Sequence, residues 1–216
     1  MPKAKHITRL LALVLITLAC GATHAGPPAP PPVDSSYVPL FDGRSLAGWK
    51  THGGQATYRA EDGCIVGRVA PGRLNSFLCT EKTFGDFILR LEFKSLVGNS
   101  GLYFRVDKGG YAGVLGFQAE VDPQNNVGGI YETAGRQWVA QPKPEEVKKW
   151  LKPKDWNELA VVALGRRVVV ELNGRVTADL KNDPGRTEGH IALQLHGGQD
   201  MDVWFKDVEL LEIAPR

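Results

Sequence analysis

Residues 86–94, DFILRLEFK, place apolar side chains at every second position, and this spacing restricts the fold more than any other feature of the chain. Phe87, Leu89, Leu91 and Phe93 fall on one side, while the other side is mostly charged. Successive side chains of a β-strand point to opposite faces, whereas a helix repeats about every 3.6 residues. The segment is therefore predicted to be a strand with one buried face.

Similar alternation returns along the rest of the chain, at 101–106, 116–121, 157–172 and 189–195, with Gly, Asn and Asp turns between the segments. Many short strands of this kind indicate a β-sandwich or a barrel. A sandwich explains why each strand has one apolar face, because each sheet buries that face against the other sheet. We therefore predict an all-β sandwich.

Three local signals refine this picture. Asn173 and Gly174 are typical of a tight hairpin turn. The alternation slips near Asp207, which predicts a bulge in the last strand. Residues 144–151 are predicted to form one short helix, because Pro144 suits a first helical position and the apolar residues that follow share a helix face.

The first 25 residues are predicted to be a secretory signal peptide. They begin with basic residues, continue with an apolar run at 10–19 that is too short to span a bilayer, and end with small residues at Ala25. Cys20 gives an alternative, because TLAC resembles a lipoprotein cleavage box with Thr where Leu is usual. The protein is thus expected in the periplasm or secreted, with lipid anchoring at Cys20 as the other interpretation.

Residues 26–36 are rich in Pro and are predicted to be a tether, which leaves residues 37–216 for the folded domain. Residues 26–216 carry 23 basic and 24 acidic side chains. This balance gives no reason to expect a nucleic-acid partner or an anionic membrane surface, and no segment is long and apolar enough to predict a membrane span.

Two cysteines, Cys64 and Cys79, lie in the predicted domain. Cys64 begins one apolar segment and Cys79 ends the next, so a hairpin of neighbouring strands would bring the thiols together. A disulfide between them is one expectation in an oxidising compartment. The other is two small buried residues that never meet.

The stretch GFQAEVDP, 116–123, raises the question of function. Phe117, Ala119 and Val121 alternate with Gln118, Glu120 and Asp122, although acidic residues are poor strand formers. We expect the outward faces of neighbouring strands to gather polar and aromatic side chains, which suit a sugar. The set comprises Tyr103, Arg105, Gln118, Glu120, Asp122, Tyr131, Glu132, Arg136, Trp138 and His196.

Several common active-site patterns are missing from the sequence. There is no GxSxG, no HExxH and no phosphate-binding loop. Sandwich glycosidases that use two carboxylates typically carry another acid shortly after such a pair, but Pro123, Gln124 and Asn125 follow Asp122 here. Direct glycoside hydrolysis by two opposed acids is therefore disfavoured.

Six segments occur in an order that resembles the 3-keto-disaccharide hydrolase-like family. They are YVPLFDGRSLAGWK, GNSGLYFR, GFQAEVD, GGIYETAGRQW, DWNELAVVALGRRVVVELNG, and GHIALQLHGG with VWFKDVEL. The likeness covers about residues 37–213. It implies a concanavalin A-like jelly-roll sandwich and an enzyme, a hydrolase or lyase acting on 3-keto-glycosides.

The resemblance also implies a reaction and a partner. A sugar 3-oxidoreductase would first convert the C3 hydroxyl to a ketone, which makes the hydrogen on C2 acidic. A base then removes that hydrogen, the C1 substituent leaves by elimination, and water adds. This route needs one base, one enolate stabiliser and one proton donor rather than two opposed carboxylates.

The resemblance suggests a role for each motif residue. Glu120 would be the base or a metal ligand, Arg105 would face the ketone oxygen, and His196 or Asp122 would protonate the leaving oxygen. The residues that would orient the sugar are Asn99, Tyr103, Gln118, Tyr131, Glu132, Arg136 and Trp138. A divalent cation held by Glu120, Asp122 and His196 is an alternative to Arg105.

Two other functions stay open on the same residues. One is a lectin-like module that binds glycans without turnover, for which the aromatic rings and hydroxyl partners are enough. The other is a surface scaffold without a sugar site. The sequence leaves the glycone, the aglycone, the anomer and the oligomeric state undecided.

Overall fold

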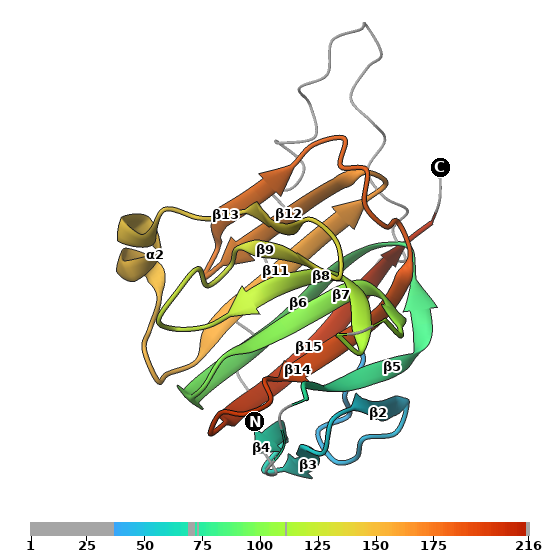
Figure 1. Ribbon diagram of the computed structural model, residues 1–216, viewed down its shortest axis with the longest axis vertical. Coiled ribbons are helices and arrows are strands. Elements are labelled where there is room, and N and C mark those ends of the chain that lie inside the picture. Colours follow the sequence, from blue (N-terminus) through green and yellow to red (C-terminus); the bar gives the residue numbers. More distant parts are fainter. Residues whose placement is uncertain (1–36, 69–71, 73, 111, 215–216) are drawn as a thin grey trace, which may run out of the picture. The chain divides into compact units, whose positions relative to one another are not determined.

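The computed structural model describes residues 37–68, 72, 74–110 and 112–214. The predicted signal peptide, Cys20 and the Pro-rich tether lie outside the described residues. Within them, the strands form two antiparallel sheets that pack as a β-sandwich, which confirms the predicted fold class (Figure 1). A search of the described residues found no helix with the length and hydropathy of a membrane span.

The first sheet, sheet A, has β6 and β15 at its centre, and its order is β13-β12-β11-β6-β15-β4-β3, with β1 also paired to β15. Its strands are β1 (Val38–Pro39), β3 (Thr57–Glu61), β4 (Cys64–Arg68), β6 (Asp86–Val97), β11 (Asn157–Leu164), β12 (Arg167–Leu172), β13 (Arg175–Leu180) and β15 (Asp202–Ile213).

The second sheet, sheet B, has the order β10-β9-β8-β7-β14-β5-β2. Its strands are β2 (Trp49–Gly53), β5 (Ser76–Phe84), β7 (Ser100–Lys108), β8 (Val114–Val121), β9 (Ile130–Thr133), β10 (Gln137–Ala140) and β14 (Gly189–Leu195). Figure 1 shows β7, β8 and β14 side by side in the middle of this sheet.

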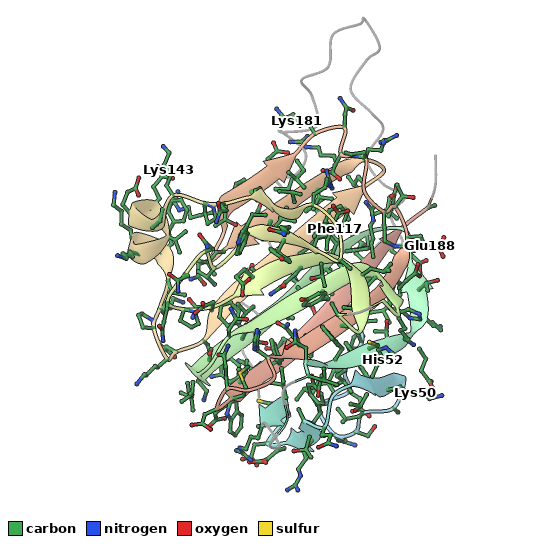
Figure 2. The ribbon with its side chains drawn as sticks, viewed as in Figure 1. Lys50, His52, Phe117, Lys143, Lys181 and Glu188 are labelled. Carbon is green, nitrogen blue, oxygen red and sulfur yellow. The ribbon has the colours of Figure 1, made fainter. Side chains whose placement is uncertain are left out.

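The core lies between the two sheets and follows the alternation of the sequence. The apolar side of β6 from Phe87 to Phe93 is buried, as predicted, and it packs with the inward residues of β8 and β14. Each buried Leu or Phe side chain contributes about 1.5–3 kcal/mol through removal from water. Figure 2 labels one of these residues, Phe117, whose ring stacks on Phe104 with centroids 5.4 Å apart.

The local signals of the sequence also hold. Asn173 and Gly174 have φ of 50° and 73° and connect β12 to β13, as a tight hairpin turn requires. The register of β15 against β6 shifts between Lys206 and Glu209, and Asp207 has φ of 50°, so the predicted bulge is present.

The predicted helix is α2 (Pro144–Trp150), which lies beside one end of the strands in Figure 1. Its first turn contains Glu145 and Glu146 and its last turn Lys148 and Lys149, an arrangement that complements the helix dipole. Val147 is buried against the core, and Asn173 Nδ2 donates to the Trp150 carbonyl over 2.7 Å, which joins the helix to the β12–β13 turn.

The expected hairpin of the two cysteine segments is wrong. Cys64 begins β4 in sheet A, whereas Cys79 lies in β5 of sheet B, so the core separates their strands. Both thiols are buried and free. Burial raises the pKa of Cys64 and raises that of Cys79 to about 11, which is typical of unreactive thiols. The strand of Cys64 pairs with β3 and β15, and the strand of Cys79 pairs with β2 and β14, so the two strands are not neighbours.

Candidate functional site

Two rows of side chains cross the outer face of sheet B, the face turned away from sheet A. This face is opposite to Leu102, Phe117 and Leu193, which point into the core. The first row comprises His52, Phe77, Gln194, Gly101 and Glu120, taken across β2, β5, β14, β7 and β8. The second comprises Lys50, Cys79, Ala192, Tyr103, Gln118, Tyr131 and Trp138, and it continues onto β9 and β10.

Glu120 is the most unusual group on this face. It is only 5% exposed, and its Oε1 has no hydrogen-bond partner among the described residues. Its Oε2 accepts a hydrogen bond from Gln118 Nε2 over 3.1 Å. Burial, together with the negative charge of Asp122, raises the pKa of Glu120 to about 8, while the nearby Asn99 amide acts in the opposite direction. A carboxylate with a free oxygen and a high pKa is suited to accept a proton near neutral pH.

Gln118 and Tyr103 lie beside Glu120, and their side chains are hydrogen-bonded to each other. Tyr103 is 2% exposed, and its hydroxyl contacts Gln118 Oε1 at 2.7 Å and Thr133 Oγ1 at 3.1 Å. The Tyr103 ring meets Phe77 edge to face, with centroids 5.1 Å apart. These two residues therefore support Glu120 from the sheet instead of presenting free groups to a sugar.

Asn99, Asp122 and His196 lie at the strand ends, one residue beyond the paired Ser100, Val121 and Leu195. Asn99 Nδ2 donates to Asp122 Oδ2 over 3.4 Å, and the Gln124 amide donates to Asp122 Oδ1 over 2.9 Å. His196 is half-buried, and its Nδ1 lies 2.8 Å from the Gly197 carbonyl. The structure thus brings these three predicted residues to the same end of the sheet as Glu120.

Tyr131 and Trp138 form an aromatic pair at the β9–β10 edge of the face. Their ring centroids are 5.3 Å apart with an interplanar angle of 80°, and Trp138 is 37% exposed. Tyr131 is half-buried, so Trp138 is the ring that could stack on the C–H face of a sugar while polar groups nearby meet its hydroxyls. Their placement is compatible with the predicted role in sugar binding.

Arg105 is not part of this site, contrary to expectation. It has φ of 51° at a bulge where the β7–β8 register shifts, so its side chain turns toward sheet A and Val106 takes the outer face instead. The guanidinium donates to the carbonyls of Gly85 and Gly165 and to Asp86 Oδ1, over 2.8–3.2 Å. Arg105 therefore holds the ends of the two sheets together, and its hydrogen-bond partners are different from those of Glu120.

Glu132 and Arg136 also differ from expectation. Glu132 is paired with Phe117 across the β8–β9 ladder, so it lies on the opposite side of the sheet from Tyr131. Arg136 contacts Glu132 and makes two hydrogen bonds to Asp183, of 2.8 and 2.9 Å. This ion-pair network fixes the β9–β10 hairpin to the segment between β13 and β14, and it leaves neither side chain for a sugar on the outer face.

A metal centre does not fit the residues that the structure describes. Among them, no group of three or more His, Cys, Asp or Glu side chains is placed to hold a metal ion. Glu120, Asp122 and His196 therefore do not form the ligand set considered from the sequence, and we derive no step through a cation.

Two residues of the first row were missed from the sequence as site residues. Gln194 is 2% exposed, and its Oε1 lies 3.5 Å from Gln118 Nε2. His52, which Figure 2 labels on β2, has its Nε2 2.8 Å from the Gly113 carbonyl and so connects the β7–β8 loop to the far edge of the sheet. The alternation around Leu193 and Leu195 places Gln194 on the outer face, but the position of β2 has no comparable signal.

Comparisons with known proteins show what this chain is similar to. The model of a family described as the 3-keto-alpha-glucoside-1,2-lyase-like domain matches residues 36–211. A search of curated proteins found no match.

Solved structures share the fold. A candidate glycosyl hydrolase from Parabacteroides distasonis is 23% identical with a TM-score of 0.61, over 82% of this chain and 94% of that one. The carbohydrate-binding module CBM66 from Bacillus subtilis is 21% identical with a TM-score of 0.60, over 76% and 96%. A galectin-like protein of unknown function from Bacillus subtilis is 15% identical with a TM-score of 0.58, over 84% and 100%.

Proposed function

This chain belongs to the 3-keto-alpha-glucoside-1,2-lyase-like domain family, and from that premise we propose that it cleaves 3-keto-glycosides by elimination followed by hydration. The observation that carries the proposal is the buried Glu120 carboxylate with its unpartnered Oε1. Burying a polar atom without a partner is costly, so such atoms are commonly retained for a ligand or a reaction.

In the proposed reaction, Glu120 Oε1 removes the proton from C2. The electron pair of that C–H bond moves into an enolate that ends on the C3 oxygen. The enolate electron pair then forms the C1–C2 double bond, the C3 ketone is restored, and the C1–O bond breaks. The leaving oxygen takes a proton. Water adds across the double bond to complete net hydrolysis. The ketone would come from a separate sugar 3-oxidoreductase.

The remaining roles are proposed for residues at the strand ends. Because Arg105 faces sheet A, the candidate donors are the Asn99 amide, which lies beside Glu120, and His196, which lies at the same end of sheet B. We assign the enolate oxygen to Asn99 and the leaving oxygen to His196. Asp122 is held by Asn99 and the Gln124 amide, and its role is to place its negative charge beside Glu120.

The first test is an assay with a matched pair of sugars. Purified protein is incubated with 3-keto-trehalose and with trehalose, each with and without a chelator. Cleavage of the ketone alone is the expected result, because only a ketone acidifies the C2 hydrogen. Cleavage of plain trehalose would contradict the elimination mechanism, and loss of activity with chelator would show that a metal is required.

A second candidate function is sugar binding without turnover, which the pair of half-buried Tyr131 and exposed Trp138 favours. Glu120→Gln separates the two candidates. If Glu120 is the general base, turnover falls by about 10²- to 10⁴-fold while sugar binding persists. A binding module would show no turnover in either form and nearly equal affinity. Glu209→Gln is the control, because Glu209 pairs with Arg90 on sheet A.

A further inference from the structure

A chain of hydrogen bonds leads to Glu120 from the neighbouring strands. Thr133 Oγ1 on β9 lies 3.1 Å from the Tyr103 hydroxyl on β7. The Tyr103 hydroxyl donates to Gln118 Oε1 over 2.7 Å, and Gln118 Nε2 donates to Glu120 Oε2 over 3.1 Å. Because a phenol has a single proton, Tyr103 must accept from Thr133 when it donates to Gln118.

The surroundings of the Gln118 amide fix which end is nitrogen. Three acceptors lie near Nε2, namely the Ser100 carbonyl at 3.4 Å, Gln194 Oε1 at 3.5 Å and Glu120 Oε2 at 3.1 Å. An oxygen at that position would face three acceptors, whereas the other end faces the hydroxyl of Tyr103. The orientation of the amide is therefore set by its partners on both sides.

Gly101 provides the space that this arrangement needs. It lies between Gln194 and Glu120 in the first row. A Cβ at Gly101 would come within 2.6 Å of both Cγ and Nε2 of Gln118. The Gln118 side chain thus lies directly over Gly101, and any larger residue at position 101 would displace it.

We propose that Tyr103, acting through Gln118, is a positioning residue that engages Oε2 of Glu120 and so leaves Oε1 as the oxygen that takes the C2 proton. The inference rests on the proposed function for the reaction, but the hydrogen-bond chain concerns this chain's own residues. Tyr103 touches no substrate in this role, because its hydroxyl is used on both sides.

The arrangement predicts a change in the titration of Glu120 when the chain is broken. A hydrogen bond donated to a carboxylate favours its charged form, so loss of the Gln118 donor raises the pKa of Glu120 further. The other titratable groups on this part of sheet B are Tyr103 on β7, Tyr131 on β9, Asp122 directly after β8 and His196 directly after β14. None of the variants below changes the charge of any of these groups at neutral pH.

Three variants break the chain in different ways. Gln118→Met removes the amide, Tyr103→Phe keeps the ring against Phe77 but removes the hydroxyl, and Gly101→Ala keeps every polar group but displaces Gln118. If Glu120 is the base, the rising limb of kcat/KM follows its pKa of about 8. In each variant we expect this limb to move to higher pH by about one unit, so that kcat/KM at a fixed pH below the limb falls about tenfold.

Tyr58→Phe is the matched control. Tyr58 is also a buried tyrosine with two hydrogen bonds, to the Ser76 and Leu193 carbonyls, but it belongs to the main core. Its loss should lower stability without moving the pH limb. A carboxyl ¹³C titration of Glu120, assigned with Glu120→Gln, reads the same coupling without any substrate.

The outcomes distinguish the two proposals. If the wild-type protein shows no turnover, the proposed function is contradicted. If the pKa of Glu120 still differs between the wild type and Tyr103→Phe, the hydrogen-bond chain is supported all the same. An active wild type would overturn the positioning role if the limb and the titration stay fixed in all three variants. A shift in Tyr58→Phe as large as that in Tyr103→Phe would also overturn it.

Discussion

Arg105 on β7 and Glu120 on β8 lie on neighbouring strands of one sheet and are buried to nearly the same extent, at 1% and 5% exposure. Arg105 turns toward sheet A, where three carbonyls and the Asp86 carboxylate accept its hydrogen bonds. Glu120 turns to the outer face, where one amide reaches one of its oxygens. The two buried ionisable groups therefore differ in hydrogen bonding: Arg105 has several acceptors, whereas one oxygen of Glu120 has no partner.

The difference shows that burial of a charge is not sufficient to identify a reactive group. A buried charge with all its partners holds parts of a fold together, and removing it leaves those partners unsatisfied. A buried carboxylate with a missing partner has instead an unfavourable charged form, which raises its pKa. The unsatisfied oxygen, more than the low exposure, is what distinguishes Glu120 from Arg105 as a functional candidate.

The largest effect is expected from Glu120 itself, through the pH dependence of stability. Its pKa rises from 4.5 to about 8 on folding, so the folded state binds the proton more tightly and loses stability as pH rises across that interval. Glu120→Gln does not titrate, and its stability relative to wild type should grow by up to about 5 kcal/mol by pH 9. Chemical denaturation at pH 4 and pH 9 measures this difference.

If the stability difference between Glu120→Gln and wild type is the same at pH 4 and pH 9, Glu120 is charged at no cost in the folded protein. The contrast with Arg105 would then fail. Glu145→Gln on α2 is a suitable control for the change of net charge, because Glu145 is exposed.

The next effect is expected from Arg105→Met, which keeps much of the side-chain volume but removes the guanidinium. The carbonyls of Gly85 and Gly165 and the Asp86 carboxylate would lose their donor at once. We expect a loss of about 3–5 kcal/mol in the free energy of unfolding. The folded fraction should keep its turnover per molecule, measured by active-site-normalised kcat. A large fall in kcat without loss of stability would return Arg105 to a catalytic role.

The smallest effect is expected from Asp86→Asn. Asp86 Oδ1 accepts from Arg105 over 3.1 Å and from the Gly165 amide over 2.7 Å, and its side chain is 27% exposed. The amide oxygen can keep both hydrogen bonds while the charge is lost, so we expect a cost of about 1 kcal/mol. Thermal unfolding in low and high salt checks this. A loss as large as that of Arg105→Met would show that the charge pair, and not the carbonyls, stabilises Arg105.

Much of the fold was predictable because burial repeats with the period of the strand. The alternation from Phe87 to Phe93 and from Phe117 to Val121 identified core faces, and Asn173-Gly174 identified a hairpin. The outward direction of Glu120 followed from the same alternation. Alternation and turn type depend on residues that are neighbours in the sequence, so they can be predicted from a single sequence.

Three placements could not be predicted. The bulge at Arg105 adds a residue to the strand and reverses the direction of the side chains after it. Cys64 and Cys79 enter different sheets, and Asp183, from a distant segment, binds Arg136. Each depends on which strand lies beside which, a matter of contacts between distant segments.

The amino-acid order alone was enough to establish the two-faced strands, the sandwich, the short helix and the family resemblance, because period, turn chemistry and motifs are local. Strand pairing settled the rest: it set the Gln118–Glu120 face of β8 beside Tyr103 on β7, moved Arg105 into the contact between the sheets, and left Glu120 Oε1 without a partner among the described residues. Desolvation and hydrogen-bond satisfaction depend on every group around an atom, and the fold brings those groups together from several strands.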